Sequence, residues 1–240
     1  RPGQPDRGAH RLQRRLRAAD RAPPPHGCRV LAARGNPVFR FDLPGTGESP
    51  RLSSLSHVEA VSAALDCLSR DHGGHSLVVG GICSAADLGW RIAESDRRVC
   101  GVLLLDGISF AGPWFALARF RRLLTRSPRH WPGMARRLLA RMGATDATPT
   151  SADFRDWPSR KEARAQMQEM LARGVRFLFI YTGGVGDRLL HLRQFGWSFG
   201  GAARNENVTV QLWPECDHLF YRPGDRQRLL NTLAGWLPRA

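Results

Sequence analysis

The sequence predicts an α/β fold in which a mostly parallel sheet is covered by helices on both faces. Short apolar runs alternate with longer stretches whose apolar residues recur at helical spacing. The short runs are continuously apolar, which is typical of strands buried on both faces of a parallel sheet. Small and polar residues stand directly after several of these runs. Because open parallel sheets bind substrate beyond the carboxyl ends of their strands, this placement predicts one functional site at that edge.

Length and cysteine content favour one domain without disulfides. A chain of 240 residues can bury a core large enough to be stable alone. Its five cysteines are odd in number and widely spaced, and no two of them form a C-x-x-C pair. This pattern indicates neither a disulfide framework nor a zinc site, and no cofactor motif is present. We expect a protein of a reducing compartment, the cytoplasm.

The charge of the chain is strongly positive, with a formal net charge of +15. Lys161 is the only lysine, and the arginines are scattered over nearly every segment. A nucleic-acid surface needs a basic stripe with interleaved aromatic residues, so this distribution argues against nucleic acid as the partner. No apolar run approaches the roughly 18 residues that a membrane span needs.

The predicted elements follow in order after an irregular, arginine- and proline-rich segment of residues 1–28. A strand is expected at 38–42, followed by a turn at 43–49 and by a helix from about 57 to 70. Ser56 and Glu59 form the capping box that opens this helix. Further strands are expected at 76–81, 102–105, 175–181 and 208–213, and helices at 84–95 and 227–237.

A helical insertion interrupts this alternation between residues 107 and 174. The segment is rich in arginine and includes Trp114, Phe115, Phe120, Trp131 and Trp157 among its aromatic residues. An insertion at this point predicts a lid over the carboxyl ends of the strands. Its aromatic residues would line an apolar pocket or pack the lid onto the body, and the sequence leaves both possibilities open.

The strand at 76–81 and the helix at 84–95 are joined by a tight turn with Cys83 at its centre. A nucleophile displayed on such a turn requires small residues two positions before it and two after it. Gly81 and Ala85 satisfy this rule around Cys83, whereas Ser84 as nucleophile would place the branched Ile82 at the first position. The dipoles at the start of the following helix favour a thiolate. We therefore predict Cys83 as nucleophile, with the backbone N–H of Ser84 donating to an oxyanion.

A thiol nucleophile needs a general base and a carboxylate that orients it. His218 follows the last predicted strand, and Asp187 follows the strand before it. The chain order is therefore nucleophile, acid and histidine, each in a loop after a strand. Asp106, at the end of the strand at 102–105, is the alternative acid. Asp187 is preferred because its glycine-rich turn can aim a carboxylate at His218.

From about residue 29 to 240 the chain resembles the α/β-hydrolase superfamily. The resemblance rests on the turn Asp-Leu-Pro-Gly-Thr-Gly-Glu-Ser at 42–49, on the elbow Gly-Ile-Cys-Ser-Ala at 81–85 and on Asp217-His218 before the last helix. The elbow together with Cys-Asp-His-Leu-Phe at 216–220 looks most like the exosortase-system-associated hydrolases. Dienelactone hydrolase also has a cysteine at this position. The resemblance implies an α/β-hydrolase fold and a hydrolase acting on a small-molecule ester or thioester.

The same resemblance implies a loop that supplies a second oxyanion N–H. His26-Gly27 is the candidate, but the residues from there to Asp42 leave little room for the helix that normally follows. The main hypothesis is therefore acyl transfer to water by Cys83, His218 and Asp187. Transfer to another acceptor by the same residues is one alternative, and a catalytically impaired binding protein of the same fold is another.

Overall fold

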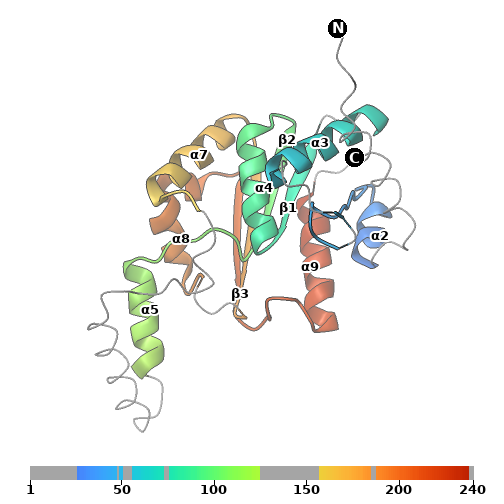
Figure 1. Ribbon diagram of the computed structural model, residues 1–240. Coiled ribbons are helices and arrows are strands. Elements are labelled where there is room, and N and C mark those ends of the chain that lie inside the picture. The colour runs from blue at the N-terminus through green and yellow to red at the C-terminus, as the bar shows by residue number, and fades with distance from the viewer. Residues whose placement is uncertain are drawn as a thin grey trace.

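The computed structural model describes residues 26–47, 49–50, 56–72, 76–124, 157–184 and 188–237. Its centre is a four-stranded parallel sheet in the order β1-β2-β3-β4, with helices on both faces (Figure 1). The strands are β1 (Leu77–Ile82), β2 (Val99–Leu105), β3 (Arg176–Thr182) and β4 (Val208–Trp213). The α/β fold class predicted from the sequence is confirmed.

Helices connect and cover the strands. Their bounds are α2 (His26–Ala32), α3 (His57–His72), α4 (Ser84–Ser95), α5 (Pro113–Leu124), α7 (Arg160–Ala172), α8 (Leu192–Phe199), the 3-10 helix η4 (Gly200–Arg204) and α9 (Pro223–Trp236). None of the helices in the described ranges has the length and apolar character needed to cross a bilayer.

Two apolar layers hold the helices to the sheet. Phe177 and Phe179 of β3 lie in the layer shared with α3, α4, α7 and α8. Leu178 and Ile180 lie in the layer shared with α9. All four side chains are fully buried. Alternate residues of one strand therefore enter opposite layers, which explains why this strand is continuously apolar in sequence.

The strand expected at residues 38–42 does not form. These residues are extended without pairing in the sheet, and β1 pairs only with β2 among the described residues. Phe41 packs against the core, while Val38 and Phe39 are exposed. An extended segment becomes a strand only when a neighbouring backbone forms hydrogen bonds with it. The apolar residues at 38–42 therefore reflect the packing of Phe41 against the core and not pairing in the sheet.

A helix does form where the sequence left little room for one. Helix α2 has seven residues and packs against α9, where a Cβ on Gly27 would lie 3.3 Å from Leu230 Cδ2. Leu31 joins the same apolar layer as α9. His26 and Gly27, the candidate oxyanion loop, are the first two residues of this short helix, which uses the limited room by forming only about two turns beside α9.

The segment predicted as a lid divides into two parts. Helix α5 extends away from the sheet (Figure 1), whereas α7 lies against the sheet. The buried side chains of α7 are Ala163, Met167, Met170 and Leu171. This helix therefore belongs to the body of the domain. The residues between α5 and Trp157 lie outside the described part of the chain.

Candidate active site

Cys83 lies between the last residue of β1 and the first residue of α4, with φ 62° and ψ −119°. A positive φ is rare for residues other than glycine and is typical of strained functional turns. The Cys83 N–H donates to the Leu105 carbonyl at 2.8 Å, and the Cys83 carbonyl accepts from Ala86 at 3.1 Å. The turn is therefore tied to β2 on one side and to the first turn of α4 on the other.

Close backbone packing explains why the turn is built from small residues. A Cβ on Gly81 would lie 2.7 Å from the Cβ of Ala85. A Cβ on Gly80, whose φ is 142°, would lie 2.0 Å from the Leu103 carbonyl oxygen. The spacing of small residues around Cys83 in the sequence thus corresponds to a real contact between strand and helix.

Ser84 is the first residue of α4, so its N–H has no acceptor within the helix. The first N–H groups of a helix point along its axis toward the amino end and favour negative charge there. The Ser84 N–H therefore follows Cys83 at the amino end of α4, and its role as an oxyanion donor stays a prediction.

His218 and Asp106 are in contact across the carboxyl ends of the strands. His218 Nδ1 lies 2.8 Å from Asp106 Oδ2. The residues are 112 positions apart in the sequence, with Asp106 directly after β2 and His218 in the loop between β4 and α9. The sheet brings them together because its strands end at the same edge, where Leu105 pairs with Ile180 and Thr182 pairs with Trp213.

Asp106 is fully buried and accepts two further hydrogen bonds. The Thr182 N–H donates to Oδ1 at 2.7 Å, and the Thr182 hydroxyl donates to Oδ2 at 2.6 Å. Buried carboxylates are stable when such donors replace the water that they lose. Burial and the nearby Asp106 charge raise the pKa of Tyr181 well above its usual value. The phenol is therefore neutral, and it donates to the Ile108 carbonyl at 2.7 Å.

Two glycines after β3 allow the loop of His218 to approach. A Cβ on Gly183 would lie 2.0 Å from the Pro214 carbonyl oxygen, and one on Gly184 would lie 2.3 Å from the backbone nitrogen of His218. The Gly183 N–H also donates to the Cys216 carbonyl at 3.0 Å. The glycine-rich turn therefore supports the histidine loop directly with its backbone.

The histidine loop is also held by its own polar residues. Asp217 accepts from the N–H of Leu219 at 2.8 Å and from the N–H of Tyr221 at 3.0 Å. Glu215 forms an ion pair with Arg228 of α9. Phe220 has a positive φ of 52° and is buried. These contacts fix the backbone on both sides of His218.

Cys216 of the same loop differs from Cys83 in its environment. Cys216 is buried, whereas Cys83 is only partly buried. Burial, followed by the hydrogen bond to Asp225 and its charge, raises the pKa of the Cys216 thiol to about 11. The five cysteines all lie in the described part of the chain, and no disulfide links any of them. At neutral pH the Cys216 thiol is therefore protonated and shielded from reagents.

The structure thus brings together the alternative acid and the predicted base. Asp187, the acid that the sequence favoured, lies outside the described residues, so its role stays a prediction. Thr182 was not identified from the sequence, because a threonine that ends a buried strand carries no signal beyond its β-branched side chain.

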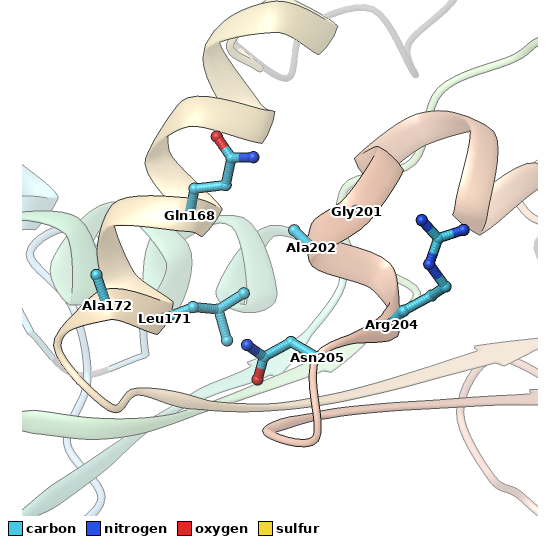
Figure 2. A pocket seen from close by; sticks show the side chains of 7 residues that line it. All are labelled: Gln168, Leu171, Ala172, Gly201, Ala202, Arg204 and Asn205. Carbon is cyan, nitrogen blue, oxygen red and sulfur yellow. The ribbon is translucent and has the colours of Figure 1, made fainter.

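A hollow of about 380 Å³ lies between the end of α7 and η4. Figure 2 shows Leu171 and Asn205 pointing toward one another there. Leu171 lies just before the amino end of β3, and Asn205 lies just before the amino end of β4. The hollow is therefore at the edge of the sheet opposite to Cys83 and His218, and it is not part of the candidate active site.

Comparison with known proteins gives one family. A family model described as the alpha/beta hydrolase family matches residues 10–230. The chain resembles in structure the Pyrococcus furiosus esterase Pf2001, with 11% identity and a TM-score of 0.53, covering 87% of this chain and 71% of that one. It also resembles the esterase domain of a Rhodothermus marinus protein, with 18% identity and a TM-score of 0.51, covering 88% and 76%. No curated protein matches the sequence.

Proposed function

This chain belongs to the alpha/beta hydrolase family, and from that premise we propose that it is an esterase or thioesterase with a cysteine nucleophile. The observation that carries the proposal is the 2.8 Å contact between His218 Nδ1 and the buried Asp106, at the sheet edge where Cys83 occupies a strained turn. A base oriented by a carboxylate beside a displayed nucleophile is the arrangement that acyl transfer requires.

Asp106 is proposed as the orienting carboxylate. It accepts the Nδ1 proton of His218, which leaves Nε2 as the atom that exchanges protons with the nucleophile. Thr182 holds the Asp106 carboxylate in place through two hydrogen bonds. Asp187 remains the alternative, and a substitution of each residue separates the two assignments.

The proposed reaction has two steps. His218 removes the proton of the Cys83 thiol, and Sγ attacks the acyl carbonyl to give a tetrahedral oxyanion beside the Ser84 N–H. Collapse breaks the bond to the leaving group, which takes the proton from His218, and a thioester remains on Cys83. Water then attacks the thioester with His218 as base, so that an acid is released and the thiol is restored.

Two observations support Cys83 over Ser84 as the nucleophile. The positive φ belongs to Cys83, and the small residues that pack at 2.7 Å, Gly81 and Ala85, are centred on it. Ser84 already has helical conformation as the first residue of α4. The likeness of the elbow to the exosortase-system-associated hydrolases, which have cysteine there, favours the same residue.

The substrate is proposed to carry an apolar acyl group. Leu219 and Tyr221 follow His218 in its loop, and both are exposed, at 70% and 80%. Large apolar side chains beside a reactive group commonly contact the apolar part of a ligand. An acceptor other than water could also take the acyl group from the thioester, so thiol and amine acceptors belong in the assay.

The experiment that tests the proposal combines turnover with intact-mass labelling. The parent chain is expected to hydrolyse p-nitrophenyl or thioester substrates and to take up one iodoacetamide adduct rapidly at neutral pH. Cys83→Ala should abolish both results, whereas the matched variant Cys67→Ala should abolish neither. His218→Ala should retain the thiol but slow its alkylation.

The outcomes separate the alternatives. Turnover that persists in Cys83→Ala and disappears in Ser84→Ala would assign the nucleophile to the serine. A Cys83 thiol that reacts no faster than an ordinary thiol, together with no turnover, would favour a binding protein of the same fold. Cys216 should not interfere, because its pKa of about 11 keeps the thiol protonated at neutral pH.

A further inference from the structure

Helix α5 exposes apolar and cationic side chains at neighbouring positions of its sequence. Leu117 is 46% exposed and Phe120 is 56% exposed. Residues three apart are neighbours on a helix surface, so these two side chains form one patch. Arg119 and Arg121 flank Phe120 in sequence and are also exposed. We call these four residues the α5 surface.

Contacts at the beginning of α5 attach it to the body of the domain and leave Leu117 and Phe120 exposed further along the helix. The Trp114 ring stacks on His191 at 5.9 Å between centroids, and the Arg193 guanidinium lies 4.9 Å from the centre of the same ring. A Cβ on Gly112 would lie 2.5 Å from the Trp197 ring. The beginning of α5 is therefore anchored on α8 and on His191, which directly precedes that helix.

The charged residues in the sequence around α5 are all arginines. Residues 107–145 contain eight arginines and neither aspartate nor glutamate. Arg119 is held over the Phe115 ring at 5.7 Å, which leaves its charge without a carboxylate from this segment. A partner for such a surface must therefore be anionic.

The combination of apolar and cationic side chains on the α5 surface distinguishes between two kinds of anionic partner, nucleic acid and a lipid bilayer. Nucleic acid binds mainly through its phosphates and needs no exposed leucine beside the arginines. An anionic bilayer takes up both kinds of side chain, since apolar residues enter the acyl boundary while arginines remain at the headgroups. Exposed Leu117 and Phe120 between cationic residues therefore favour a lipid surface.

We propose that the α5 surface docks the protein on an anionic lipid bilayer. Leu117 and Phe120 enter the interface, and Arg119 and Arg121 pair with anionic headgroups. Because α5 follows β2 at the edge that carries Cys83 and His218 (Figure 1), docking holds this edge of the sheet near the membrane. The docking itself requires no turnover and is independent of the proposed hydrolase activity.

Sedimentation of the full chain with vesicles tests the proposal. The parent chain should sediment with vesicles of phosphatidylcholine mixed with phosphatidylglycerol, and much less with phosphatidylcholine alone. Leu117→Ser combined with Phe120→Ser should lower the partition coefficient by about tenfold or more, because two apolar side chains are removed from the interface. Arg119→Gln combined with Arg121→Gln should lower it by roughly tenfold and weaken its salt dependence.

Two control variants match these changes elsewhere on the surface. Val38→Ser with Phe39→Ser removes an exposed apolar pair, and Arg91→Gln with Arg97→Gln removes an exposed cationic pair. Both should bind like the parent, and all variants should unfold at the parent temperature in circular dichroism.

Three results would overturn the proposal. They are equal sedimentation of the parent with both vesicle types, equal loss in the control and α5 variants, and no sedimentation with either vesicle type. In the last case, salt-dependent binding of an oligonucleotide would assign the arginines to nucleic acid.

Discussion

Thr182 donates both its backbone N–H and its hydroxyl to Asp106, at 2.7 Å to Oδ1 and 2.6 Å to Oδ2. The oxygen that accepts the hydroxyl also lies 2.8 Å from His218 Nδ1. Since the carboxylate is fully buried, these contacts fix its orientation. Thr182 is thus a positioning residue for the proposed base.

Thr182→Val should lower kcat by about tenfold and change KM little. The substitution keeps the backbone donor and the β-branched shape but removes a hydroxyl bonded to a charged acceptor, a loss of about 1.5–3 kcal/mol. The pH profile of kcat should shift as well, because Asp106 is coupled to His218. Thr209→Val in β4 is the control. An unchanged profile in Thr182→Val would contradict the positioning role.

Asp106→Asn and Asp187→Asn should differ sharply in kcat. If Asp106 orients His218, the neutral amide of the Asp106→Asn variant can no longer accept the Nδ1 proton as a carboxylate does. The kcat of this variant should then fall by about a hundredfold or more. Asp187→Asn should retain most of the parent activity. Steady-state kinetics on one p-nitrophenyl ester checks both variants. The reverse ranking would restore Asp187 as the acid.

Gly81→Ala should destabilise the protein by about 1–3 kcal/mol and slow alkylation of Cys83. The added Cβ would lie 2.7 Å from that of Ala85, which cannot rotate away. Gly235→Ala in α9 meets no atom within 4 Å and should stabilise by roughly 0.5–1 kcal/mol. Urea denaturation and labelling rates measure both effects. Equal stabilities would show that the elbow tolerates a larger residue.

The sheet could be predicted from the sequence because its strands are buried on both faces. Residues 208–213 were predicted as a strand and form β4 with the same bounds. Residues 38–42 have a similar apolar pattern but do not pair, since pairing depends on a neighbour that local sequence does not encode. Helix α7 was assigned to the lid because its sequence is rich in charged residues. The helical spacing of Ala163, Met167 and Met170 is the pattern that indicates a helix buried on one side.

The site was predictable in its residue types and less so in its pairings. The elbow has a local signature, because strand and helix must approach closely on both sides of Cys83. Asp106 and Asp187 each follow a strand, so the sequence could not rank them by distance to His218. Glycines 183 and 184 were interpreted as a turn that aims Asp187. In the structure they make room for the backbone at Pro214 and His218.

Asp96 should contribute stability that depends on pH. Its carboxylate accepts from the Arg98 N–H at 2.9 Å and from the Arg98 guanidinium at 2.6 Å, and the same guanidinium lies 2.7 Å from Asp66 of α3. The hydrogen bonds to Arg98 lower the pKa of Asp96 below its ordinary value of 3.8, against the opposing effect of burial. The pair links the start of β2 to α3.

A lowered pKa in the folded state means that folding favours the charged carboxylate. This stability is complete above the unfolded pKa and is lost as pH falls through the folded pKa, so the loss begins below about pH 5. Asp96→Asn should therefore cost about 1–2 kcal/mol at pH 7 and progressively less toward pH 3. Urea denaturation of parent and variant over this range measures the difference. A difference that stays constant with pH would show that the Asp96 charge contributes nothing to folding.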